Sequence, residues 1–171
     1  SFISILDADA LKAINKSDLK KLKNAILTPH AKEFELLFKE RLPKNNQDIK
    51  KRINIVKKHS KKYKNIVLLV KGNPDIIAFN GTIKLNFTGN PAMTVGGTGD
   101  VLAGLCAGIV AQTAFNKLKN QNEKNDKLFN AACAAAFVNG LAGDHVHKVL
   151  GNGLIASDLL KEIALIMKKY S

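Results

Sequence analysis

The strongest constraint on the fold comes from residues 65–70, where five consecutive apolar residues follow an asparagine. A short apolar run without alternation is typical of a β-strand that is buried on both faces, as in a parallel sheet covered by helices. Two shorter apolar runs, residues 2–6 and 25–27, also end in polar groups, as the long run ends at Lys71. The sequence therefore predicts an α/β protein with a mainly parallel sheet, which binds ligands where several strands end.

The remaining elements are predicted from helical spacing of apolar residues and from turn signals. Residues 80–81 are Asn-Gly, a two-residue turn that suits hairpin twist, so residues 75–79 and 82–87 are predicted to form an antiparallel hairpin at the sheet edge. Asn46 is a predicted N-cap, and Gly104 and Gly108 are predicted to allow close backbone packing. The predicted helices cover residues 31–40, 46–63, 100–115, 128–150 and 156–170, with a polar connector at 116–126.

The length of 171 residues predicts one domain, residues 1–171, with a single core. The chain begins inside a strand with no preceding βα unit, so we expect it to be the later part of a larger domain. It has no apolar run of about 18 residues and no basic leader, which predicts a cytoplasmic protein that does not contact membranes. Cys106 and Cys133 lie among alanines and glycines, and they are predicted to fill the core rather than to form a disulfide or a metal site.

The net charge of +13 raises the hypothesis of a nucleic-acid-binding module. Between Lys12 and Lys71 there are 18 basic and 5 acidic residues, while the rest of the chain holds nine of each. Arginine, which binds base edges best, occurs only at Arg41 and Arg52, and aromatic residues are sparse in this third of the chain. The pattern favours a solvated, lysine-coated helical face over a nucleic-acid surface.

The sharpest chemical signal is the Gly-rich turn at residues 96–99, which directly precedes Asp100 and a long apolar helix. Backbone N–H groups at a helix N-terminus, together with the helix dipole, favour phosphate or a developing negative charge. Asp100 is either a helix cap or a general base that deprotonates a hydroxyl attacking a phosphoryl group, and one carboxylate can do both. The turn is not a Walker A loop, because no Gly-Lys-Ser/Thr follows.

Several polar residues at the predicted strand ends have two interpretations each. Lys71 either places an ammonium near phosphates or is simply solvated. His30 is either bonded to a backbone carbonyl or in contact with substrate. Asp7 and Asp9 either cap the following helix, which we favour, or hold a water or a cation.

Six motifs follow one another along the chain: Asp7-Ala8-Asp9-Ala10-Leu11, Leu27-Thr28-Pro29-His30-Ala31-Lys32-Glu33, Lys71-Gly72, Gly89-Asn90-Pro91-Ala92-Met93, Gly96-Gly97-Thr98-Gly99-Asp100-Val101-Leu102-Ala103-Gly104 and Ile155-Ala156-Ser157-Asp158-Leu159. In these motifs and in their order the chain resembles the ADP-dependent NAD(P)H-hydrate dehydratases, which are ribokinase-like enzymes of nicotinamide coenzyme repair. The resemblance runs from Asp7 to about Lys161, and it extends to the C-terminal domain of the bifunctional NAD(P)H-hydrate repair enzymes.

The resemblance implies that the chain dehydrates the (6S)-hydrate of NADH or NADPH, by phosphorylation of its hydroxyl and elimination of phosphate. ADP, or ATP in eukaryotic relatives, is the implied co-substrate, with Mg²⁺ on its phosphates and no side chain assigned as a metal ligand. Asp100 would be the catalytic base and would contact substrate with His30. The implied anion hole is Gly97, Thr98 and Gly99, and the implied nucleotide-binding residues are Lys71, Gly72, Asn73, Pro74, Asp75 and Gly99. Homo-oligomers, often tetramers, and an upstream epimerase domain in many bacteria are also implied.

The chain departs from the family pattern at two positions. Asn139 stands where relatives commonly have a histidine, and Asp75 stands where the nucleotide loop more often has a small or hydroxyl side chain. Three alternatives stay open from the sequence. One is a ribokinase-like kinase for a vitamin-precursor alcohol, which would share the Gly-rich turn, and another is the basic nucleic-acid-binding module. The third is a truncated, catalytically inactive scaffold that still packs into an oligomer, which a nucleotide-binding test would distinguish from an active enzyme.

Overall fold

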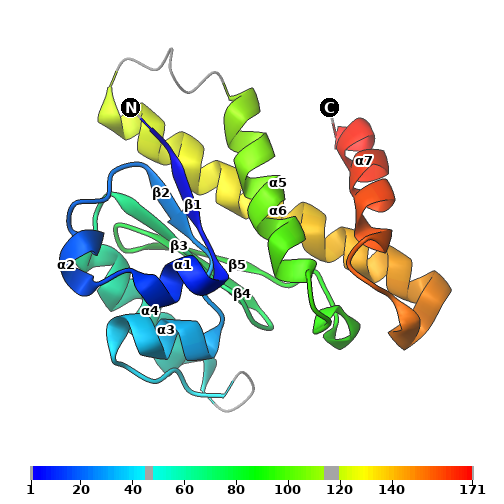
Figure 1. Cartoon of the computed structure of the whole chain (residues 1–171), viewed down its shortest axis with the longest axis horizontal. Coiled ribbons are helices and arrows are strands. Elements are labelled where there is room, and N and C mark those ends of the chain that lie inside the picture. The colour runs from blue at the N-terminus through cyan, green and yellow to red at the C-terminus, as the bar shows by residue number, and fades with distance from the viewer. Residues whose placement is uncertain (1, 45–47, 114–119, 171) are drawn as a thin grey trace.

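The computed structural model describes residues 2–44, 48–113 and 120–170 and is shown in Figure 1. The strands are β1 (Ser4–Leu6), β2 (Ala25–Leu27), β3 (Ile66–Val70), β4 (Asp75–Phe79) and β5 (Thr82–Asn86). The helices are α1 (Ala8–Ala13), α2 (Lys16–Leu19), α3 (Ala31–Phe38), α4 (Ile49–Lys62), α5 (Thr98–Gln112), α6 (Gln121–Leu150) and α7 (Asp158–Tyr170), with short 3₁₀ turns at η1 (Pro91–Met93) and η3 (Gly151–Gly153).

The five strands form one mixed sheet in the order β1-β2-β3-β4-β5. The first three strands are parallel to one another, and β4 and β5 continue the sheet as an antiparallel hairpin. Asn80 and Gly81 form the turn with φ angles of 44° and 86°, the left-handed region that this kind of hairpin requires. The prediction of a mainly parallel α/β sheet with an antiparallel edge is therefore confirmed.

Helices cover both faces of the sheet, which gives three layers (Figure 1). Alternate residues of β3 enter opposite cores: Leu68 and Val70 pack with α1 to α4, whereas Val67 and Leu69 pack with α5 and α6. All five residues of β3 are buried, as predicted for a strand covered on both faces. A third, smaller core joins the second half of α6 to α7, so the prediction of a single core was wrong.

The predicted helices exist, but several boundaries were wrong. The helix expected at 128–150 begins at Gln121, with Asn120 as its N-cap, so most of the predicted polar connector is helical. The helix expected at 100–115 runs from Thr98 to Gln112, and Phe115 lies outside the described residues. The N-cap of α4 is Asp48, whose carboxylate accepts the Lys51 N–H, and Asn46 lies outside the described residues.

Two predictions about the core have different outcomes. Gly104 and Gly108 were expected to allow close backbone packing, but both are exposed, and a Cβ at either would meet nothing within 4 Å in the described part of the chain. The cysteines fill the core as predicted: Cys106 is buried and Cys133 partly buried, and burial raises the pKa of the Cys106 thiol to about 12. No described helix is long and apolar enough to span a bilayer.

We expect the buried His59 of α4 to make stability depend on pH. Its Nε2 lies 2.7 Å from Glu40 Oε2 and its ring packs on Phe38, with burial lowering its pKa below the usual 6.5. Between the lowered pKa and the usual value the folded state binds fewer protons than the unfolded state, so the free energy of unfolding falls as pH drops through this window. Urea denaturation at about pH 7 and about pH 5 measures this change. The free energy of unfolding should fall less between the two pH values in His59→Gln than in the natural protein, and an equal fall in both would contradict the role given to His59.

Candidate functional site

The carboxyl ends of the three parallel strands meet at one edge of the sheet. The backbone continues the strand pairing beyond the strands themselves, because Thr28 N–H donates to the Leu6 carbonyl and Lys71 N–H to the Pro29 carbonyl, at 3.0 and 2.9 Å. Residues at these three ends are far apart in the chain and close in space. Ligands of open α/β sheets bind at this edge, where the sequence predicted them.

A partly buried ion pair joins two of the strand ends. Lys71 Nζ lies 2.8 Å from Asp7 Oδ1 and 3.8 Å from Glu33 Oε2, and the Lys71 and Asp7 side chains are 22% and 12% exposed. Asp7 occupies the N-cap of α1 without a capping hydrogen bond, so the favoured interpretation of Asp7 as a cap was wrong. Its carboxylate instead holds Lys71, whose ammonium is therefore fixed rather than simply solvated. Asp9 pairs with Lys12 on the surface, at 2.7 Å.

The loop after β3 carries most of the predicted nucleotide-binding residues and is held from both sides. Asp75 accepts hydrogen bonds from the Gly72 N–H at 2.8 Å and from Asn86 Nδ2 at 3.0 Å. Burial raises the pKa of the Asp75 carboxyl. This effect outweighs the hydrogen bonds and the nearby cations, which lower the same pKa. Arg52 donates to the Lys71 carbonyl at 3.2 Å and to the Pro43 carbonyl at 3.1 Å. Asp75 thus supports the loop from within.

Replacing Arg52 by Met is expected to lower the free energy of unfolding by about 1–3 kcal/mol, because two backbone carbonyls lose a donor and Asp75 loses a nearby cation. Arg52 is 2% exposed, so water cannot easily replace it. Urea denaturation measures the change. Arg41→Met is the matched control, because Arg41 is exposed, and similar losses in both variants would contradict the role given to Arg52.

The Gly-rich turn forms the N-terminus of α5, as the sequence predicted. Gly97 is the N-cap with φ 91°, in the left-handed region, and the first helical bond runs from the Val101 N–H to the Gly97 carbonyl. The N–H groups of residues 98–100 therefore have no partner within the helix and can bind an anion. A Cβ at Gly99 would lie 3.3 Å from Lys71 Nζ and 3.4 Å from Asp7 Oδ2, so this helix end adjoins the ion pair.

Asp100 lies in the first turn of α5 and is exposed. It does not serve as the cap, since Gly97 occupies that position with no side-chain capping bond. Within residues 2–44, 48–113 and 120–170, no hydrogen bond or ion pair of the Asp100 carboxylate is found. The capping hypothesis for Asp100 is thus wrong, and the carboxylate is free to meet a ligand.

His30 is the N-cap of α3 in a capping box with Glu33. Its Nδ1 accepts the N–H groups of Lys32 and Glu33, and Glu33 Oε2 accepts the His30 N–H. The hypothesis that His30 bonds a backbone carbonyl was wrong, because the ring nitrogen accepts from amides instead. Nδ1 as acceptor places the ring proton on Nε2, which lies 3.3 Å from Glu33 Oε1 on a side chain that is 48% exposed. Nε2–H remains the group able to reach a substrate.

The loop that follows β5 completes the site, and its contacts with α6 were not predicted from the sequence. Asp144 of α6 accepts the Gly89 N–H and Asn90 Nδ2, both at 2.9 Å, and so holds the loop that follows β5. Thr88 donates to the Phe137 carbonyl of the same helix at 3.1 Å. The spacing of Gly140, Gly143 and Asp144 was the available signal, because small residues let a backbone approach a helix closely.

The two loops and the N-terminus of α5 enclose a pocket of about 410 Å³. Gly97, Asp100 and His30 lie outside its lining. Of the predicted nucleotide-binding residues, Lys71, Gly72, Asn73, Asp75 and Gly99 line it, together with Thr98 of the predicted anion hole. The other lining residues are Thr88, Gly89, Asn90, Pro91, Met93, Thr94, Leu102, Asn139 and Gly140. No cluster of three or more His, Cys, Asp or Glu residues that would hold a metal occurs in the part of the chain described here.

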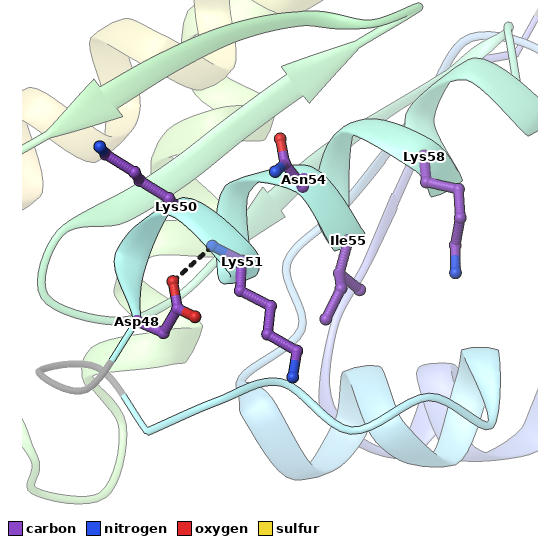
Figure 2. A pocket seen from close by; sticks show the side chains of 6 residues that line it. All are labelled: Asp48, Lys50, Lys51, Asn54, Ile55 and Lys58. Carbon is purple, nitrogen blue, oxygen red and sulfur yellow. Dashed lines mark hydrogen bonds between the residues drawn. The ribbon is translucent and has the colours of Figure 1, made fainter.

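A second hollow, of about 420 Å³, lies on the outer face of α4 (Figure 2). Lys50 and Lys51 point to different sides of the helix there, and Lys58 pairs with Glu40 at 2.6 Å. Arg52, one of the two arginines of the basic third, is buried and bonded to backbone carbonyls. This surface fits the predicted solvated lysine face better than a nucleic-acid interface, which needs arginines and aromatic residues facing outward.

Comparison with known proteins identifies the family of the chain. The model of the family described as NAD(P)H-hydrate dehydratase matches residues 3–165. The chain belongs to this family. It is 41% identical over 174 residues to the ADP-dependent (S)-NAD(P)H-hydrate dehydratase of Nitrosopumilus maritimus, with 98% of this chain and 55% of that protein covered. It is 38% identical to the bifunctional NAD(P)H-hydrate repair enzyme of Pyrobaculum aerophilum, with 98% of this chain and 30% of that protein covered.

Two solved structures share the fold of the chain. The ADP/ATP-dependent NAD(P)H-hydrate dehydratase of Bacillus subtilis, crystallised with ATP and Mg²⁺, has a TM-score of 0.75 and 28% identity, with 98% of this chain and 56% of that one covered. A ribokinase-like superfamily protein of Enterococcus faecalis has a TM-score of 0.73 and 25% identity, with 98% and 52% covered. The ribokinase-like fold is confirmed, and the chain spans about half the length of the dehydratases it matches.

Proposed function

We propose that the protein dehydrates the (6S)-hydrate of NADH or NADPH and so returns it to the reduced coenzyme, with ADP as phosphoryl donor and ATP as the alternative. The observation that carries the proposal is the free Asp100 carboxylate beside a Gly-rich helix N-terminus, in a member of the NAD(P)H-hydrate dehydratase family. The family favours this reaction over phosphorylation of a vitamin-precursor alcohol, which would need the same turn.

In the proposed reaction Asp100 accepts the proton of the substrate hydroxyl as its oxygen attacks the terminal phosphorus of the nucleotide. The bond from this phosphorus to the bridging oxygen breaks, and AMP leaves, or ADP when ATP is the donor. The N–H groups of residues 98–100 stabilise the negative charge that develops on the transferring phosphoryl group. Lys71, held by Asp7, places a positive charge beside the same helix end. The carbon–oxygen bond of the phosphate ester then breaks, and inorganic phosphate leaves with the bonding electrons. Solvent takes a proton from the neighbouring ring carbon, and the electrons of that carbon–hydrogen bond form the ring double bond.

We assign no described side chain to Mg²⁺, which would be held by the phosphate oxygens of the nucleotide and by water, as Mg²⁺ usually is at nucleotide sites. The ion would neutralise phosphate charge when bound. By the same family relationship we propose that the protein forms a homo-oligomer, specifically a tetramer. We also propose that it acts in the cytoplasm, where reduced coenzymes are used. We also propose that this chain is the C-terminal portion of a dehydratase domain, with an epimerase domain upstream, as the bifunctional relatives suggest.

The test uses the complete protein and hydrated NADH, with ADP, ATP or no nucleotide, and follows the recovery of reduced-nicotinamide absorbance. Recovery that requires a nucleotide and releases inorganic phosphate is the expected result. A stable phosphorylated product without recovery of the coenzyme would replace the proposal with a kinase activity. A protein that binds DNA or RNA with steep salt dependence, and recovers no coenzyme, would instead support the basic surface as the working site.

A further inference from the structure

The pocket contains a buried amide that the protein leaves without a hydrogen bond. Asn139 of α6 is 8% exposed, and its Oδ1 has no partner among the residues described by the structure. No hydrogen bond of its Nδ2 occurs among those residues either. A buried acceptor without a donor costs free energy, and such groups in native proteins usually have a partner that the polypeptide does not supply.

Three residues of α6 near Asn139 contact the loops of the pocket. The Ala136 carbonyl accepts Asn86 Nδ2 at 3.1 Å, one turn before Asn139, and Asp144 holds Gly89 and Asn90. Gly140 lies directly against Thr88. These contacts fix α6 and the loop around Asn139, so the amide is held rigidly in the pocket wall while its own polar atoms stay free. This is the arrangement of a preorganised ligand contact.

The same pocket is lined by Lys71, Gly72 and Gly99, which the family resemblance assigns to the nucleotide. Phosphate oxygens accept hydrogen bonds but donate none, so they cannot satisfy the Asn139 carbonyl oxygen. A primary amide presents one acceptor and one donor side by side. Adenine presents the complementary pair, its exocyclic amine next to a ring nitrogen, and this is the preferred partner of Asn in base recognition.

We propose that Asn139 binds the adenine base of the nucleotide through this paired contact and selects adenine over 6-oxopurines. Hypoxanthine and guanine carry a carbonyl oxygen where adenine carries the amine, so two acceptors would face each other at Asn139 Oδ1. The inference rests on the proposed function for the presence of a nucleotide in this pocket, and it adds the group that reads the base.

The test measures binding of ADP and IDP, and in parallel ATP and ITP, to the complete protein by calorimetry. The natural protein should bind the adenine nucleotide about 5- to 150-fold more tightly than its inosine counterpart. Asn139→Leu, which has nearly the same shape, should lose about this factor for adenine nucleotides and little for inosine nucleotides. Its melting temperature without ligand should not fall, because the substitution removes an unpaired buried amide.

Asn130→Leu is the matched control, since Asn130 is exposed on the same helix, and it should change neither affinity. Equal binding of ADP and IDP by the natural protein would overturn base recognition by Asn139 and leave the proposed function standing. Failure to bind any adenine nucleotide would overturn both. A lower melting temperature of ligand-free Asn139→Leu would show a structural role, and a change confined to the KM of the hydrated coenzyme would assign the amide to the other substrate; either result overturns the inference.

Discussion

Asp100→Asn is expected to lower the turnover of hydrated NADH by roughly 10² to 10⁴, with the affinity for ADP little changed. The amide keeps the size of the carboxylate but cannot accept the hydroxyl proton. The nucleotide contacts proposed for the loop after β3 and for Gly99 do not involve this side chain. A single-turnover assay with saturating ADP, together with a direct measurement of ADP binding, separates the chemical step from nucleotide affinity.

Asp100→Asn should change stability little, because the side chain makes no hydrogen bond or ion pair in the described chain and its charge adds only about 0.3–1 kcal/mol near a helix N-terminus. Asp126→Asn is the matched control, since Asp126 is an exposed helical carboxylate on α6, and it should leave turnover unchanged. Near-normal turnover of Asp100→Asn would remove the general base from the proposed mechanism.

The sequence predicted those elements whose burial is regular. The apolar run at 65–70 identified β3 because both faces of that strand are covered, and Asn80-Gly81 identified the hairpin because its backbone requires a left-handed turn. The start of α6 was missed because its first residues, from Gln121, are mostly polar and exposed. Hydrophobic periodicity appears only where a helix face meets a core, so an exposed first turn leaves only its N-cap as a signal.

The sequence predicted several residues of the candidate site but not the contacts between them. Asp7 and Lys71 were both placed at strand ends, yet their ion pair joins residues 64 positions apart, and the pairing depends on the parallel register of β1, β2 and β3. A short polar residue before a helix is commonly its N-cap. This general preference led to the wrong prediction for Asp7 and left a capping role open for Asp100. The tertiary partner decides such cases, and no local pattern contains it.

Gly140→Ala is expected to destabilise the protein by about 1–3 kcal/mol or more and to weaken nucleotide binding. A Cβ at Gly140 would lie 2.6 Å from the backbone carbonyl carbon of Thr88 and would also collide with the Thr88 hydroxyl. Backbone cannot rotate away as a side chain can, so the loop after β5 must move off α6. Thr88 and Gly89 both line the pocket, and this movement would therefore change its shape as well as its stability.

Gly108→Ala, in another helix, is expected to stabilise the protein, in contrast to Gly140→Ala. Gly108 lies inside α5, and a Cβ there would meet nothing within 4 Å in the described part of the chain. The substitution should raise the free energy of unfolding by about 0.5–1 kcal/mol, because alanine loses less backbone entropy on folding than glycine. Thermal unfolding and ADP titration of both variants in the complete protein measure the contrast. A stable Gly140→Ala would contradict the close approach of Thr88 to α6, and a destabilised Gly108→Ala would show that a segment outside the described residues packs against α5.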